Sequence, residues 1–232
     1  NLHEPSQWIT GPGGIQTFKV PWREIEPNYA FIDELEALGG NIQGAGNKSR
    51  FEYWLNAFKF MRATARVGCT LGELEIDMQS IMEAEEAERT AMVQELALPI
   101  RLRLTAEWTD MVGHLLNYVD TPGDLGTITN LEQHSWRALD LMHQHDAQLE
   151  AWLGEKLPAD AFLSTDYQGE TRLIVPTKRT LLERDEDFNL KVMVLSKSKT
   201  EPPVLHWRRL GESAFAQKTA THVNRGVYQI RL

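Results

Sequence analysis

Apolar residues recur with a helical period over residues 27–153, and a proline at the start suits a first helical turn. The first run ends at Gly39-Gly40. A second helix is predicted to begin near Asn47 and to end at Gly68, and the capping-box pattern of Thr70–Glu73 is predicted to begin a third. The apolar face of the second helix, which we expect in the core, consists of Phe51, Trp54, Leu55, Phe58, Met61 and Ala65.

The later part of this region predicts further helices. A long helical stretch runs over residues 87–119 and contains Pro99, which lacks an amide donor, so a kink or a break is expected near Leu98. Asn130 has a pattern typical of the cap that begins the next helix. About five helices joined by short glycine-containing connections predict an antiparallel α-helical bundle over residues 27–154.

The hydrophobic period changes to two after the bundle region. Residues 155–170 contain proline and aspartate and are predicted to form a connector. Over residues 171–232, apolar and polar positions alternate in five or six short runs separated by turn residues. This pattern predicts a small β-sandwich of immunoglobulin or fibronectin type. The expected fold class is therefore α+β in two parts, a bundle followed by a sandwich.

Residues 1–26 form an N-terminal segment without a clear element of its own. The sequence reaches the turn Gly11-Pro12-Gly13-Gly14 within a few residues of Asn1, and the pattern predicts neither a helix nor a strand before that turn. Because a domain rarely begins with a turn, we expect this segment to continue from a domain upstream of Asn1.

Composition and charge narrow the classes of function. The chain has 232 residues, 42% of them hydrophobic and 25% charged, which is typical of one large globular domain or two ordinary ones. A formal charge of -9 argues against nucleic acid as a partner, and the acidic stretch from Glu73 to Glu95 is predicted to be a solvated helix face. No apolar run approaches the roughly 18 residues of a membrane span. The single Cys69 excludes an internal disulfide and is expected to be a small buried residue.

Few residues match a known catalytic pattern. Glu4 precedes Pro5, as the acid/base carboxylate does in many barrel glycosidases, but it has no adjacent asparagine and no preceding strand. His143 and His145 point to different sides of a helix, so we expect surface histidines rather than metal ligands. The glycines of residues 11–14 lack the lysine of a phosphate-binding loop. We therefore predict no catalytic residue, no metal and no cofactor in this sequence.

Two features are compatible with a secreted protein that contacts sugars. The chain has seven tryptophans, and Trp8 and Trp22 lie in loop-like sequence outside any apolar face. Their rings are expected either to stack on sugars or to dock the N-terminal segment onto the bundle. Asn47-Lys48-Ser49 is a glycosylation sequon, which makes Asn47 a candidate modification site and is consistent with a secreted or periplasmic location.

Several stretches together resemble a group of large secreted bacterial and fungal proteins, described as agarase-like proteins or glycoside hydrolases. The order and the spacing of the stretches match, as well as their residues. They are Pro5–Ile15, Gly44–Asn47 running into Arg50–Asn56, Phe60–Ala63, Glu95–Arg101, Thr121–Gly126, Asn130–His134 and His222–Tyr228.

The resemblance implies a carbohydrate-active parent protein in which this region follows a barrel-like catalytic domain. Its helices would support that domain and line one side of a cleft for a polysaccharide or oligosaccharide, with the catalytic carboxylates upstream. Candidate substrate-binding residues are Trp8 for stacking, and Glu132 and His134 at the predicted start of a helix. The alternative is a non-catalytic module for carbohydrate binding or protein assembly. An outward Trp207 would favour sugar binding, and a buried Trp207 would favour the scaffold.

Overall fold

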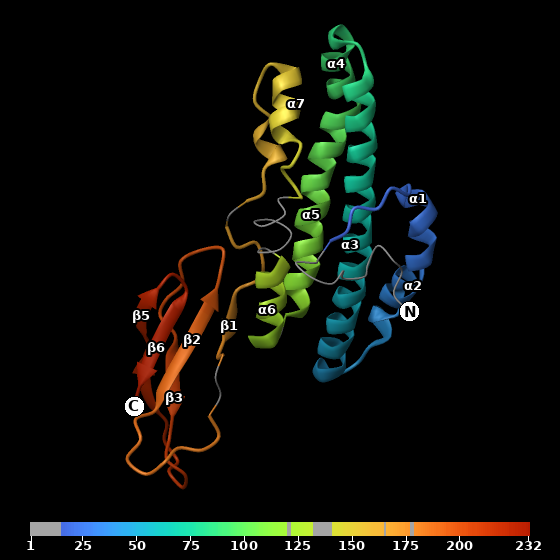
Figure 1. Cartoon of the computed structure of the whole chain (residues 1–232). Helices are drawn as coiled ribbons and strands as arrows, with labels where there is room; N and C mark the ends of the chain where they lie inside the picture. Colours follow the sequence, from blue (N-terminus) through green and yellow to red (C-terminus); the bar gives the residue numbers. More distant parts are fainter. Residues whose placement is uncertain (1–14, 120–121, 132–140, 165, 177–178) are drawn as a thin grey trace. The chain divides into compact units, whose positions relative to one another are not determined.

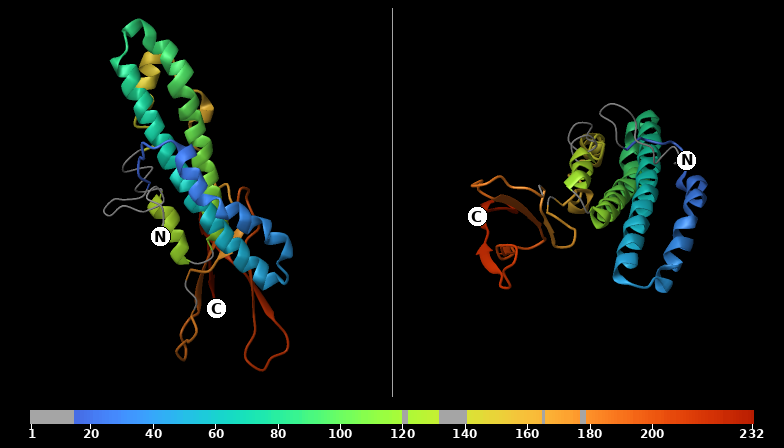
Figure 2. Two further views of the ribbon diagram at one scale, coloured as in Figure 1. Left: turned by 90° about the vertical axis from the view of Figure 1, so that its right-hand side faces the viewer. Right: turned by 90° about the horizontal axis from the view of Figure 1, so that it is seen from below.

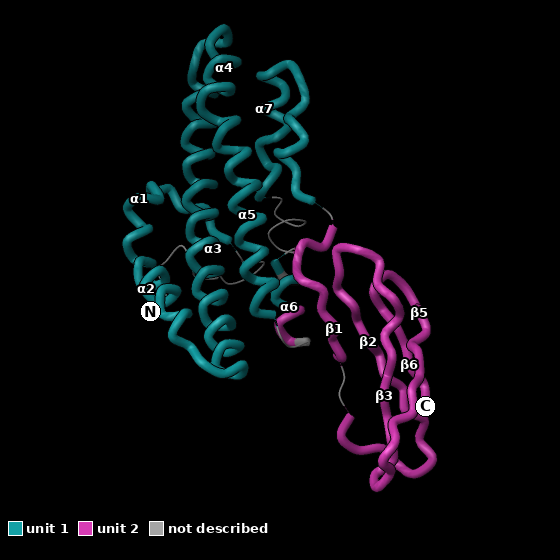
Figure 3. Tube along the Cα trace, turned by 180° about the vertical axis from the view of Figure 1, so that it is seen from behind, with its two compact units in different colours: residues 1–119, 126–164 teal, residues 120–125, 165–232 magenta. Residues whose placement is uncertain are grey.

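The computed structural model describes residues 15–119, 122–131, 141–164, 166–176 and 179–232 (Figure 1). The chain divides into two compact units (Figure 3). The helical unit contains residues 1–119 and 126–164, and the β unit contains residues 120–125 and 165–232. The helices precede the strands along the sequence, and all strand pairs are antiparallel, so the fold class is α+β.

Two long helices form the centre of the helical unit. The helix α3 spans Ala45–Glu83 and packs along α5, which spans Leu98–Tyr118 (Figure 1). The short α4, Glu86–Met92, joins them at one end. Figure 2 shows α1 and α2 beside α3. The remaining elements of this part of the chain are α1 (Trp22–Ile25), η2 (Glu26–Tyr29), α2 (Phe31–Ala37), η3 (Gly39–Asn41), α6 (Pro122–Asn130), α7 (Asp146–Leu153) and η6 (Ala159–Ala161).

The helix α3 runs without interruption through Gly68 and through Thr70–Glu73, so the predicted helix end and the predicted new start are both wrong. The reason is a tertiary contact. Residues 15–20, which we call the docked segment, lie against this part of α3, and the amide of Phe18 donates to the carbonyl of Gly68 at 2.9 Å. A Cβ atom at Gly68 would lie 2.6 Å from the Gln16 carbonyl oxygen. The glycine therefore makes room for a neighbouring chain and does not end the helix.

The interruption expected near Leu98 is present. Residues Val93–Ala97 form a π-helical turn between α4 and α5, and Pro99 follows within the first turn of α5. Proline at this position has no amide to place in the helical ladder, so the chain can continue as a helix after one widened turn. Asn130 was predicted to cap the start of a helix, and that prediction is wrong because Asn130 is itself the last residue of α6; residues 132–140 lie outside the described part of the chain.

The core of the helical unit confirms only part of the predicted apolar face of α3. Leu55 and Ala65 are buried with Tyr29 and Ile32, whereas Trp54 is 57% exposed. Trp54 was expected in the core, and that prediction is wrong. Adjacent helical positions point about 100° apart, so a helix that buries Leu55 turns residue 54 toward the edge of its apolar face.

The β unit contains a four-stranded sheet with the order β1-β2-β6-β5 and a separate β3–β4 pair. A small cluster of buried residues, Val192, Ala220, Tyr228 and Ile230, forms its core. Leu205 of β3 packs against this cluster, so the hairpin shares a core with the larger sheet. The strands are β1 (Arg172–Ile174), β2 (Asn189–Leu195), β3 (Val204–Trp207), β4 (Ala216–Thr219), β5 (Thr221–Asn224) and β6 (Val227–Arg231).

Candidate functional site

The structure places only two of the predicted site residues. Trp8, Glu132 and His134 lie outside the described residues, as does Glu4. Trp207 is the last residue of β3, where it pairs with Ala216 and is half-buried. It is thus neither fully outward nor fully in the core.

Asn47 lies exposed in the first turn of α3. Its Nδ2, the atom that glycosylation would modify, donates to the carbonyl of Gln43 at 3.0 Å, and its Oδ1 accepts from Arg50 at 2.9 Å. Both bonds lie on the surface of the helical unit, so they leave the side chain within reach of solvent.

A pocket of about 240 Å³, bordered by four charged side chains, lies between α3 and α5. Its two alanines differ in burial, since Ala63 on α3 is buried and Ala106 on α5 is exposed. Sequence reasoning did not identify this site, because its residues come from positions about forty residues apart. The pocket is lined by Ala63, Arg66, Arg103, Ala106, Glu107 and Asp110.

Glu107 organises the polar groups of the pocket. It is 9% exposed, and its Oε1 accepts from Nε of Arg66 at 2.8 Å, while its Oε2 accepts from the Thr70 hydroxyl at 2.6 Å. Nε of Arg103 lies 3.7 Å from the same Oε1, and Nη2 of Arg103 is paired with Glu73. A buried carboxylate is stable only when it is paired in this way. The network therefore fixes both guanidinium groups at the side of the pocket.

Cys69 lies in the same part of α3 and is buried, as expected. Burial, together with the nearby negative charges of Glu107 and Glu73, raises the pKa of its thiol to about 11. Since the thiolate is the reactive form of cysteine, this protonated thiol is a poor nucleophile at neutral pH.

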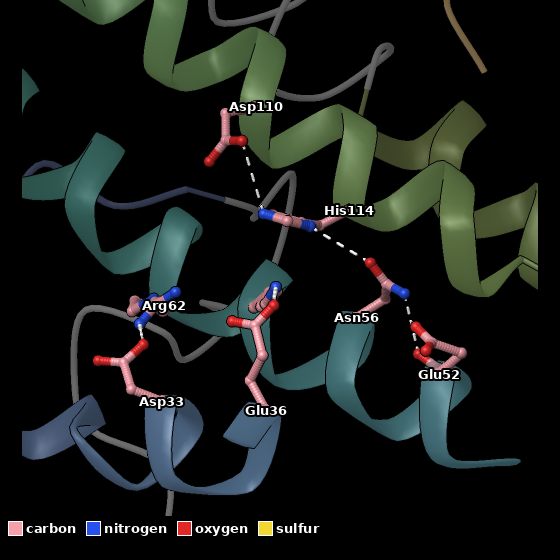
Figure 4. Close-up of polar contacts among 8 residues, drawn as sticks. Asp33, Glu36, Glu52, Asn56, Arg62, Asp110 and His114 are labelled. Atoms are coloured by element: carbon pink, nitrogen blue, oxygen red, sulfur yellow. Dashed lines mark hydrogen bonds and ion pairs between the residues drawn. The ribbon is translucent and has the colours of Figure 1, made fainter. Parts of the chain in front are cut away.

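A histidine lies one helical turn beyond the pocket (Figure 4). Nε2 of His114 is 3.5 Å from Oδ1 of Asp110, and Nδ1 is 3.3 Å from Oδ1 of Asn56. The amide of Asn56 is oriented by the bond from its Nδ2 to the carbonyl of Glu52, at 2.9 Å. Both ring nitrogens of His114 therefore face an oxygen acceptor, the amide oxygen of Asn56 on one side and the carboxylate of Asp110 on the other.

Burial lowers the pKa of His114, although the adjacent Asp110 acts in the opposite direction. Two ion pairs next to this group, Arg62 with Asp33 at 2.7 Å and Lys59 with Glu36, connect α3 to α2 (Figure 4). The histidine therefore lies between α3 and α5 with its Nε2 facing a carboxylate.

A buried ion pair lies elsewhere in the helical unit. Arg101 is fully buried, and its Nε and Nη2 donate to the two carboxylate oxygens of Asp146 at 2.7 and 3.0 Å. Thr105 also accepts from Arg101 and donates to the carbonyl of Ala161. The only sign of this buried pair in the sequence is Arg101 itself, a charged residue next to Ile100 on an apolar helix face.

The two histidines beside this pair are not the surface residues that the sequence predicted. His143 is half-buried, and its ring stacks on Phe162 with 6.1 Å between the ring centres. Nε2 of His145 is buried and has no hydrogen-bond partner among the described residues. Burial lowers the pKa of His145, with Glu75 and Asp146 acting in the opposite direction.

The described residues contain neither a metal-binding cluster nor a membrane-spanning helix. No group of three or more His, Cys, Asp or Glu side chains in the described part of the chain is placed to hold a metal ion. None of the helices in the same ranges has both the length and the apolar character that crossing a membrane requires. Comparison with known proteins gives no relative, because no family model, no curated protein and no solved structure matches the chain.

Proposed function

We propose that this chain is the helical and β-sheet portion of a carbohydrate-active enzyme, a polysaccharide glycoside hydrolase of the agarase-like kind. In this proposal the helices form an antiparallel bundle that supports the catalytic domain and lines one side of its cleft. The β unit is a small sandwich related to immunoglobulin or fibronectin domains. The catalytic carboxylates belong to a part of the protein outside this sequence, and the substrate is a polysaccharide or oligosaccharide.

The observation that carries the supporting role is the fixed position of the docked segment on α3. Ile15 is 3% exposed, the Phe18 amide bonds to Gly68, and Nζ of Lys19 lies 3.1 Å from Glu75. The backbone approaches α3 so closely that a Cβ at Gly72 would lie 2.3 Å from the Phe18 carbonyl oxygen. So close a contact between two backbones, which only glycine allows, suits a segment that supports a neighbouring domain.

The carboxylates of the pocket are consistent with catalysis elsewhere. A glycosidase needs one carboxyl group that donates a proton and a second that attacks or activates water. Both oxygens of Glu107 already accept hydrogen bonds from Arg66 and Thr70, so this carboxylate is engaged by its own structure. Asp110 faces His114.

The proposal is tested by comparing the 232-residue chain with the complete product of its gene. Both are assayed for the release of reducing ends from agarose and other galactans. We expect the complete product to be active and the 232-residue chain to be inactive. Hydrolysis by the 232-residue chain would show that its catalytic carboxylates lie within this sequence, and an inactive complete product would refute the hydrolase.

A matched pair of variants tests the supporting role in the complete product. Gly72→Ala places a methyl group against the docked segment, whereas Gly113→Ala adds one in α5 where no atom lies within 4 Å. We expect the first variant to lower kcat and the second to leave it unchanged. Equal kcat values for the two variants would show that the docking of this segment does not affect catalysis.

The non-catalytic alternative is supported by Trp54. Its indole is exposed, stacks on Phe58 at 6.1 Å and meets Tyr53 edge-on at 5.3 Å, so a flat ring is held in place at the surface. Such a ring can stack on a sugar face. If the chain is a carbohydrate-binding module, Trp54→Ala abolishes binding of galactan oligosaccharides in titration calorimetry, while Leu38→Ala, another exposed apolar residue, does not.

The location outside the cytoplasm also belongs to the proposal. Its support is the exposed side chain of Asn47 in a glycosylation sequon. Expression in a eukaryotic secretory host should add a glycan mass that is absent from Asn47→Gln. A chain that passes through that pathway without the added mass would exclude Asn47 as a modification site.

A further inference from the structure

The pocket between α3 and α5 contains hydrogen-bond donors that the described residues leave unused. Arg66 and Arg103 both turn Nε toward Glu107, at 2.8 and 3.7 Å. Nη2 of Arg103 is paired with Glu73. Among the described residues, no group accepts from either Nη of Arg66 or from Nη1 of Arg103. Two guanidinium groups thus border one cavity, with several N–H donors available to a ligand.

The number of donors indicates the chemistry of that ligand. Hydroxyl groups both donate and accept, whereas a carboxylate or a sulfate only accepts, which suits a site that is rich in N–H groups. Guanidinium is planar and matches such oxyanions with two parallel hydrogen bonds. Because Glu107 holds Arg66 through Nε, the Nη edge of that guanidinium is already oriented before a ligand binds.

The charges near the pocket oppose an anion only weakly. Glu107 compensates one of the two guanidinium groups from a buried position. Asp110 and Glu73 are also negative, but their side chains are 68% and 50% exposed, so water and salt screen their repulsion. The side chains of Arg66 and Arg103 are themselves 49% and 41% exposed, so an oxyanion would be held mainly by hydrogen bonds that fit the planar guanidinium groups.

We propose that Arg66 and Arg103 form a binding site for an oxyanion, a carboxylate or sulfate ester carried by a saccharide. The saccharide part of this inference rests on the proposed function, and the oxyanion part rests on the pocket alone. The acidic sugar would place its charged group between the two arginines and its ring against Ala63 and Ala106, which also line the pocket.

The test is titration calorimetry of the 232-residue chain at low ionic strength. The ligands are glucuronate, glucose 6-sulfate, glucose, acetate and inorganic sulfate. We expect the two charged sugars to bind, glucose not to bind, and the free anions to bind more weakly than the charged sugars. Arg66→Gln and Arg103→Gln should each weaken binding about 10- to 100-fold, since each removes charge-assisted hydrogen bonds.

Three further variants separate binding from folding. Arg50→Gln removes a surface guanidinium from the same helix and should change nothing. Arg66→Lys keeps a positive charge near Glu107 but loses the planar donor pair, so it should remain folded by circular dichroism and still bind weakly. Asp110→Asn removes a nearby negative charge and should tighten binding severalfold.

Equal binding of glucose and glucuronate, or unchanged binding by folded Arg66→Lys and Arg103→Gln, would overturn the oxyanion site. Free anions that bind as tightly as the charged sugars would overturn the saccharide part. Binding is measured without hydrolysis, so its failure is distinct from failure of the proposed enzyme. An inactive complete product that still binds charged sugars would refute the hydrolase and leave this site intact.

Discussion

The helical unit and the β unit differ in what they bury. The helical unit encloses a complete ion pair, Arg101 with Asp146, and a buried carboxylate, Glu107, each with several hydrogen-bond partners. The core of the β unit centres on a cluster of four buried residues, and large apolar side chains such as Leu210 and Phe215 are exposed.

The two units should therefore be sensitive to different kinds of substitution. In the helical unit, the stability depends on polar groups that cannot lose a partner without leaving a buried charge. In the β unit, little apolar surface is enclosed, so strand pairing and close backbone contacts contribute a larger share of the stability. We therefore expect the largest losses from ionic substitutions in the first unit and from backbone contacts in the second.

The largest effect is expected for Asp146→Ala. The substitution leaves the fully buried guanidinium of Arg101 without its carboxylate, which should cost about 3–5 kcal/mol of unfolding free energy. Urea denaturation followed by circular dichroism of the helices measures it. Lys156→Ala removes a surface ion pair with Glu150 and serves as the control, with no measurable change expected. A cost for Asp146→Ala as small as that of the control would show that the pair is open to water.

Gly226→Ala should be the most damaging small change in the β unit. A Cβ at this position would lie 2.1 Å from the backbone oxygen of Val194, where the Val194 amide also donates to Gly226 at 2.7 Å. Forcing β2 and β6 apart should cost about 1–3 kcal/mol. Amide exchange of the strand residues reports the loss, and Gln229→Ala on the exposed face of β6 is the control. Unchanged protection in Gly226→Ala would mean that the strands tolerate the shift.

Two glycines of the helical unit should respond with opposite signs. Gly72→Ala forces the docked segment away from α3 and should destabilise by about 1–3 kcal/mol. Gly113→Ala meets no atom within 4 Å, so only its helix propensity counts, and it should stabilise by up to about 1 kcal/mol. Thermal unfolding of both variants measures the difference. The same sign in both would show that the docked segment does not press on Gly72.

The smallest effect concerns pH. The pKa values of His114 and His145 are lowered in the folded protein, so the unfolded chain binds protons more readily below the usual histidine value near 6.5. Stability should be complete above that pH and should fall on acidification, by less than about 1.4 kcal/mol per pH unit for each histidine. His145→Leu should flatten the profile. An unchanged profile for His145→Leu would contradict the burial of its Nε2.

The sequence was sufficient to predict the change from helices to strands near residue 154, because hydrophobic periodicity is local. The predicted helix ends were wrong where a contact with a segment distant in the sequence determines whether the helix continues. Gly68 resembles a helix end, but it is a site of backbone contact with residues 15–20. Trp54 lies at the edge of a face that only the packing of Leu55 defines.

The pocket could not be found from the sequence for the same reason. Arg103 and Glu107 are one turn apart on α5, which is an ordinary helical ion-pair spacing, and nothing in the pattern links them to Arg66 on α3. The sequence gives only a weak indication of the pocket, and that indication concerns the burial of Glu107 rather than a function. Glu107 falls beside Leu104 and Met111 on an apolar helix face, where a carboxylate needs partners.

The docked segment makes a long-range contact with α3, a helix that is built mainly from local contacts. The helix α3 is built from local contacts, whereas the bond between Phe18 and Gly68 closes a loop of fifty residues. Contacts of such long range form late during folding and can open first. The amide proton of Phe18 should therefore exchange with solvent earlier than those at the centre of α3. Its exchange rate would measure how often the docked segment leaves α3 while the helices remain folded.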